Sequence, residues 1–252
     1  MEPGLAEGWD DGVCCTGVLV HGSPEAIAGA LGRAVAVCDG GRVRRDAVPE
    51  GTRGYALLPA GRAWTIVQLA DRLVDSGQGD YLAPLFEEAS AALSGRVVAR
   101  APDELRYETP IALAARLSQA LNTRAIALWG SDEWPGLSGG AFVGQGTLKS
   151  ALSAYSPEVI AWAAASRRLL QEGRGEDDDE GPPMDAGATY RWSPGKGIER
   201  VAGRAADLLD EALRAVGAGF DNADLLNDWA EALAAQGEGA EIDDVVALWC
   251  AV

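Results

Sequence analysis

The chain is poor in histidine and lysine: its 252 residues include one histidine, His21, and two lysines, Lys149 and Lys196. Its 38 acidic side chains outnumber the 21 basic ones, which gives a formal net charge of -17. This balance argues against nucleic acid as a partner, because phosphate binding needs clustered Lys and Arg. It also argues against an anionic membrane surface. A basic protein partner is favoured, since opposite fields accelerate encounter. The alternative is that the acid only maintains solubility.

Cysteines and long apolar runs are also scarce. The four cysteines are Cys14, Cys15, Cys38 and Cys250, and none has CxxC spacing. With one histidine they form no usual metal-ligand set, so we predict no metal and no cofactor. Buried reduced thiols are expected, as is typical of a reducing compartment. No apolar run approaches the roughly 20 residues of a membrane span. The N-terminus, MEPGLAEGWDDG, lacks the features of a secretory signal, which predicts a cytoplasmic protein.

The alternation of short strand and helix patterns predicts a mixed α+β fold. We expect an α/β domain over 12–155, in which an N-terminal β-sheet packs against helices, and a mainly helical region over 156–252. An acidic linker is expected at 172–187. Strands are expected at 15–20, 33–38, 55–58, 64–69, 96–100, 125–129 and 138–143, with 55–58 and 64–69 as a hairpin. Helices are expected at 25–31, 80–93, from Pro110 to about 121, 157–171 and 198–216. The run 243–250 fits either a helix or a buried strand.

Local signals mark two of the helix starts. Ser23 before Pro24, and Thr109 before Pro110, combine a capping side chain with a proline at the first helical position. A weak internal similarity relates EASAALSGRVVARAPDE to RLSQALNTRAIALWGSDE. It predicts two successive helix–strand units, with a βαβ crossover between the strands 96–100 and 125–129. Duplication of one unit would explain this similarity, and the alternative is that the common amphipathic pattern of packed helices and strands produces most of it.

Neither His21 nor the glycine-rich stretch predicts a catalytic site. Catalysis by His21 needs a nucleophile and an orienting group, and only Cys14, Cys15 and Ser23 lie near it in sequence. We therefore interpret His21 as a loop histidine without a catalytic role. The stretch GGAFVGQGTLKS lacks the glycine that a phosphate-binding loop places directly before its lysine. It is interpreted as a glycine-rich turn, and so is SPGKG at 193–197.

Acidic residues follow several of the predicted elements. Asp132-Glu133 comes after the strand 125–129, and Asp103-Glu104 after the strand 96–100. Together the two pairs would line one sheet edge as an acidic patch for a basic ligand, with Trp134 as an exposed aromatic anchor. Acid–base chemistry or cation binding by the pair, and plain solvated loop charge, are the alternatives. The predicted partner-binding residues are Asp103, Glu104, Asp132, Glu133, Trp134, Glu176, Asp177, Asp178, Asp179 and Glu180.

Two segments resemble stretches of small uncharacterised bacterial proteins of the toxin-immunity type. They are RLSQALNTRAIALWGSDEWPGLSGGAFVGQGTLKSAL and GYALLPAGRAWTIVQ. The resemblance implies an immunity or antitoxin-like protein that binds and neutralises a basic toxin. It transfers no functional residues, because immunity proteins share no catalytic site. Two alternatives stay open: an enzyme that uses His21 or Asp132/Glu133, and a structural or assembly subunit. The oligomeric state is left undetermined.

Overall fold

The computed structural model describes ten segments of the chain, and they form a mixed α+β fold. The described residues are 16–32, 34–39, 42–43, 55–60, 63–69, 79–97, 109–130, 138–171, 188–218 and 247–251. The strands are β1 (Thr16–His21), β2 (Ala34–Asp39), β3 (Arg42–Val43), β4 (Tyr55–Pro59), β5 (Trp64–Leu69), β6 (Arg124–Gly130), β7 (Ser138–Gly144), β8 (Thr147–Ser153), β9 (Thr189–Ser193), β10 (Gly197–Val201) and β11 (Ala247–Ala251). The helices are α2 (Pro24–Leu31), α3 (Gly79–Leu93), α4 (Pro110–Ala120), α5 (Pro157–Gln171) and α6 (Ala205–Val216).

All these strands belong to one sheet with the order β10-β9-β8-β7-β6-β1-β5-β4-β11-β2-β3. Every described pairing is antiparallel. β1 lies in the middle, between β5 and β6, and β6 to β10 follow one another as a meander. The last strand, β11, lies between β4 and β2. The sheet therefore combines strands from both sides of residue 156.

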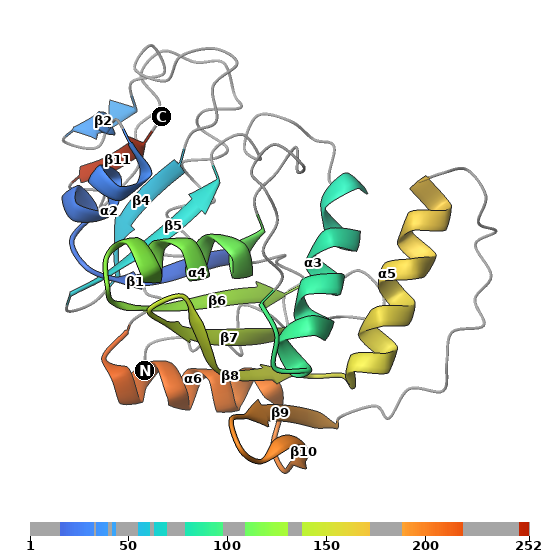
Figure 1. The fold of residues 1–252 in the computed structure, drawn as a ribbon. Helices are drawn as coiled ribbons and strands as arrows, with labels where there is room; N and C mark the ends of the chain where they lie inside the picture. Colours follow the sequence, from blue (N-terminus) through green and yellow to red (C-terminus); the bar gives the residue numbers. More distant parts are fainter. Residues whose placement is uncertain are drawn as a thin grey trace.

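The helices cover the two faces of the sheet unequally (Figure 1). α4 packs across β6, β1 and β7 on one face, and α3 lies beside it and packs against α5. The main core forms between this helical layer and the sheet, and it includes Val18, Phe86, Leu117 and Trp129. α6 covers the opposite face, where Leu209 packs against β7 next to Gly140. Both faces in the middle of the sheet are thus buried.

Local sequence signals explain where the helices start. The Ser23 hydroxyl accepts a hydrogen bond from the N–H of Ala26 at 3.4 Å, and Thr109 accepts one from Ala112 at 3.4 Å. Proline follows each cap, as predicted, because its missing N–H costs nothing there. Thr109 also donates to the buried carboxylate of Glu88, which links the start of α4 to α3.

The hairpin and the two turns are confirmed. β4 and β5 pair in antiparallel register, with Leu57 opposite Val67. The stretch GGAFVGQGTLKS forms β7, a tight turn and β8, so Lys149 lies on a strand. Gln145 and Gly146 have φ values of 54° and 74°, as a type I′ turn requires. The SPGKG stretch is the turn between β9 and β10.

Two predicted elements differ from the structure. Arg96 and Val97 belong to no strand, and the neighbours of β6 are β1 and β7, both antiparallel to it, so the predicted βαβ crossover is wrong in the described residues. The rest of 96–100 lies outside the described residues. The helix predicted over 198–216 starts only at Ala205. Ile198 and Val201 are spaced three residues apart, which fits the period of a helix, but both residues belong to strand β10.

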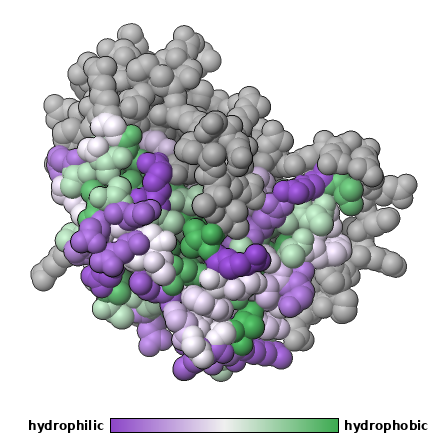
Figure 2. Space-filling view, viewed as in Figure 1, coloured by the Kyte–Doolittle hydropathy of each residue, from purple (hydrophilic) through white to green (hydrophobic). Residues whose placement is uncertain are grey.

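No described helix is both long and apolar enough to cross a membrane. On the face shown in Figure 2, hydrophobic residues of the described part form small patches between hydrophilic ones. Two large hydrophobic side chains in the described residues are more than one third exposed: Leu169 on α5 and Ile198 on β10, each 43% exposed. Isolated apolar residues on a helix surface are ordinary, whereas one on a sheet edge has consequences for pairing.

Tyr155, between β8 and α5, is expected to make the stability of the protein depend on pH in the alkaline range. Partial burial raises the pKa of its phenol above the ordinary value of 10.0. The folded state therefore holds this proton more tightly than the unfolded chain. Its contribution to stability is complete below pH 10 and is lost as the pH rises through the folded-state pKa. We expect the melting temperature of the wild type to fall more steeply between pH 9 and 11 than that of Tyr155→Phe. Identical slopes in differential scanning calorimetry would contradict this.

Candidate functional site

The residues predicted to bind a partner all lie outside the described residues. This holds for Asp103 and Glu104, for Asp132, Glu133 and Trp134, and for Glu176, Asp177, Asp178, Asp179 and Glu180. The structure does, however, place the described residues to which these segments are attached. Their positions define a candidate surface.

The strand register shows that two of the acidic segments attach to the same end of the sheet. Trp129, near the end of β6, lies opposite Thr16 of β1 and Gly139 of β7. Ser153 of β8 and Tyr190 of β9 continue this row. We call it the Trp129 end. Segment 131–137, with Asp132 and Glu133, connects β6 to β7 here, and segment 172–187, with the acidic run 176–180, leads into β9 here.

Further segments attach to the same end. β1 starts at Thr16, so residues 1–15 precede it here. β4 starts and β5 ends in this row, with Tyr55 opposite Leu69, so segments 44–54 and 70–78 are attached here as well. α4 starts on the same side of the molecule in Figure 1, after segment 98–108 with Asp103 and Glu104. All three predicted acidic groups are therefore tied to framework positions on one side.

The negative charge of the chain resides almost entirely outside the described framework. The described residues contain 12 of the 21 basic and 10 of the 38 acidic side chains, a formal charge of +2. The remaining residues contain 9 basic and 28 acidic side chains, a formal charge of -19. The sheet and its helices are thus nearly neutral, and the acid is concentrated in the segments that connect them.

The opposite end of the sheet contains His21. Its ring meets the indole of Trp64 edge-on, with 5.2 Å between the ring centroids, and the guanidinium of Arg124 lies 5.7 Å from the same indole. The Trp64 N–H donates to the carbonyl of Val216 at 3.2 Å, which holds the end of α6 against the sheet. These residues come from β1, β5 and β6 and are far apart in sequence, so no sequence pattern predicts the group.

The geometry around His21 fits a structural role. The Thr123 hydroxyl donates its one proton to the backbone carbonyl of His21 at 2.9 Å. Its contact with the ring nitrogen Nδ1 is longer, at 3.5 Å, and the direction of that contact depends on the tautomer of His21. Ser23 caps α2, and Cys14 and Cys15 lie outside the described residues. Within the described part of the chain, no three His, Cys, Asp or Glu side chains are close enough to hold a metal ion.

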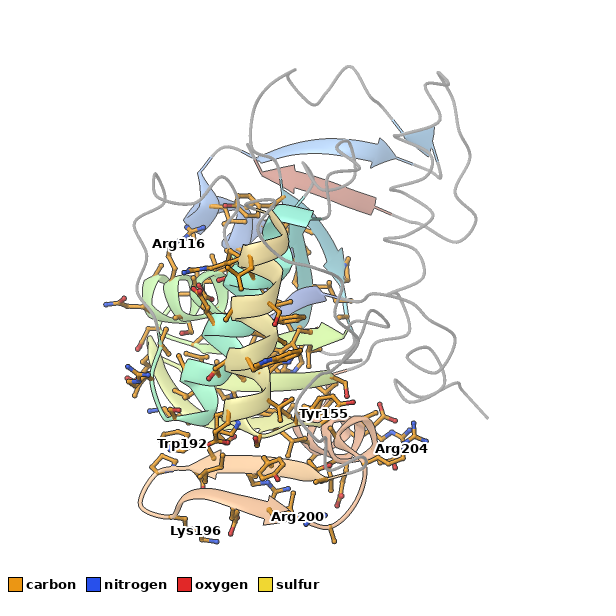
Figure 3. All side chains as sticks on the ribbon, turned by 90° about the vertical axis from the view of Figure 1, so that its right-hand side faces the viewer. Arg116, Tyr155, Trp192, Lys196, Arg200 and Arg204 are labelled. Atoms are coloured by element: carbon orange, nitrogen blue, oxygen red, sulfur yellow. The ribbon has the colours of Figure 1, made fainter. Side chains whose placement is uncertain are left out.

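Sequence reasoning overlooked a basic region in this acidic chain. We call residues 189–204, which are β9, β10 and the loop after them, the basic hairpin. It contains Arg191, Lys196, Arg200 and Arg204 but only one acid, Glu199. Figure 3 shows Lys196 at the turn, and Arg200 and Arg204 toward the other end. A charge count in a short sliding window would have found it; the whole-chain charge conceals it.

Comparisons with protein families, with curated proteins and with solved structures find no match for this chain.

Proposed function

We propose that this chain is an acidic binding protein of the immunity or antitoxin type, which neutralises a basic partner protein. The observation that carries the proposal is the distribution of charge. The segments outside the described framework have a formal charge of -19, and several of them attach at the Trp129 end. We propose the residues predicted in 103–104, 132–134 and 176–180 as the contact residues. The proposed compartment is the cytoplasm.

A near-neutral framework with acidic connecting segments suits electrostatic capture. The long-range field steers a basic protein toward the acidic segments, which raises the association rate by roughly 10- to 1000-fold at low salt. The described strands in the middle of the sheet, such as β1 with Val18, Leu19 and Val20 fully buried, supply a rigid support. Charge neutralisation of the partner's basic surface is then a sufficient mechanism of inhibition, with no chemical step.

The experiment is capture of the partner by the tagged full-length chain in its host, followed by measurements with the purified pair. We expect one basic protein to be recovered and its toxicity in a growth assay to be suppressed by co-expression of the chain. Replacing Asp132 with Asn and Glu133 with Gln should raise the dissociation constant at least tenfold at low salt, because close interfacial charge pairs contribute more than about 1 kcal/mol each. Surface plasmon resonance at two salt concentrations measures this.

The matched control removes the same charge from the framework. Glu158 on α5 and Glu211 on α6 are exposed, and the double variant Glu158→Gln/Glu211→Gln also loses two negative charges. It should change the affinity less than twofold. If both double variants weakened binding equally, the loss would be explained by net charge alone, which would contradict the proposed contact residues. Recovery of no basic partner at low salt would contradict the proposed function itself.

A further inference from the structure

β10 forms one edge of the sheet. Among the strands that the structure describes, it pairs with β9 alone and comes first in the sheet order. On such a strand, alternate backbone N–H and C=O groups point away from the sheet and are available to another extended chain. The hairpin that presents this edge is well defined by local contacts. The N–H of Lys196 donates to the carbonyl of Ser193 at 3.2 Å, and the Thr189 hydroxyl donates to the carbonyl of Gly203 at 2.6 Å.

An apolar anchor lies on this edge. Ile198 is 43% exposed and pairs with the half-buried Trp192 of β9, so both side chains share one sheet face. Trp192 in turn packs against Gly95 at the end of α3: a Cβ at that glycine would lie 2.5 Å from the indole. Because paired residues share a face, the residue of an added strand opposite Ile198 would meet this apolar surface.

Basic side chains flank the anchor. Arg200 pairs with Tyr190 and lies on the same face as Ile198, two residues along the strand, and its side chain is exposed. Lys196, at the turn, is exposed as well (Figure 3). Charged residues on an edge oppose pairing with an identical edge through like-charge repulsion. The same charges attract an acidic strand, so the chemistry of the edge selects against a second copy of β10 and for an acidic segment.

We propose that the β10 edge is a docking site for an extended acidic segment of a partner protein, which adds to the sheet as a further strand. The segment has an apolar and an acidic residue two positions apart, so that the first meets Ile198 and the second meets Arg200. Main-chain hydrogen bonds supply affinity in this mode, and the side chains supply specificity. The basic residues of this edge have the opposite charge to the acidic segments of the proposed function.

The experiment uses the full-length chain and a fluorescein-labelled peptide that repeats Val-Thr-Glu-Thr, which places valine and glutamate alternately on one face. Fluorescence anisotropy at low salt should show saturable binding, and a Val-Thr-Lys-Thr peptide should bind at least tenfold more weakly. Arg200→Glu and Ile198→Asp should each weaken binding of the acidic peptide at least tenfold. Hydrogen–deuterium exchange should show the amides of 197–201 protected by the peptide.

The control is Lys149→Glu, which makes the same charge reversal at an exposed position of β8 in the same sheet. It should change the affinity for the peptide less than twofold. Strand addition would be overturned if Lys149→Glu lost as much binding as Arg200→Glu, or if the peptide bound without protecting residues 197–201.

The acidic residues of the chain itself could compete with the peptide. To test this, the measurement is repeated with residues 176–180 neutralised to Gln and Asn. Absence of peptide binding to both the wild type and the neutralised variant would overturn this proposal. Failure to capture a basic protein would instead overturn only the proposed function.

Discussion

Replacing Gly139 with alanine is expected to lower the free energy of unfolding by roughly 1–3 kcal/mol, because the added methyl group overpacks a site whose neighbours have no room to move. A Cβ at this position would lie 2.5 Å from the ring of Trp129 and 2.6 Å from the carbonyl oxygen of Leu152. The indole is fully buried, and the carbonyl is backbone of the adjacent strand β8. Neither group moves without disturbing the sheet at the Trp129 end.

Gly29 provides the matched control for this substitution. It lies within α2, and a Cβ there meets nothing within 4 Å. Gly29→Ala should therefore stabilise the protein by about 0.5–1 kcal/mol, since alanine restricts the unfolded chain and favours the helix. Urea denaturation followed by circular dichroism measures both variants. The steric argument fails if Gly139→Ala unfolds at the same urea concentration as the wild type.

Replacing Phe86 with alanine is expected to cost about 3–5 kcal/mol, as is usual when a large buried aromatic side chain is truncated. Phe86 is fully buried on α3, in the core between the helical layer and the sheet. Its neighbours Leu85 and Ala89 belong to the same core, so the site has little freedom to collapse around the cavity. A loss of this size is a large part of the stability of an ordinary domain.

Leu169→Ala serves as the comparison for Phe86→Ala. Leu169 lies on α5, which packs against α3, but its side chain is 43% exposed. Its truncation should cost less than about 1 kcal/mol, because little apolar surface returns to water. Thermal unfolding by calorimetry distinguishes the two variants. Similar melting temperatures for both would mean that α3 contributes much less to the core than its burial indicates.

Local physical signals made part of the fold predictable. Ser23 and Thr109 cap the two helices that the sequence predicted at these positions, because a capping side chain and the N–H group it satisfies lie three residues apart. The turn at Gln145 and Gly146 is equally local, since it depends on two residues that tolerate positive φ. Such features need no information from distant parts of the chain.

The strand predicted over 96–100 and the helix predicted from Ile198 were wrong where the structure describes them, for a related reason. Apolar residues at 198 and 201 satisfy both a helix and a short strand, and pairing with Trp192 and Thr189 on β9 decides between them. Arg96 continues from the end of α3, where Gly95 adopts a φ of 78° against Trp192, and forms no strand. Contacts between distant residues therefore decide between helix and strand where the spacing of apolar residues fits both.

By itself, the sequence determined the charge of -17, the helix caps, the hairpin and the clusters of acid, because each is a property of composition or of neighbouring residues. Only the tertiary structure decided the sheet order, with β11 between β4 and β2, and the common end to which several acidic segments attach. It also brought His21, Trp64 and Arg124 together and left β10 at an edge. The physical reason is that pairing between distant strands depends on which apolar faces bury one another, and this is a property of the whole chain.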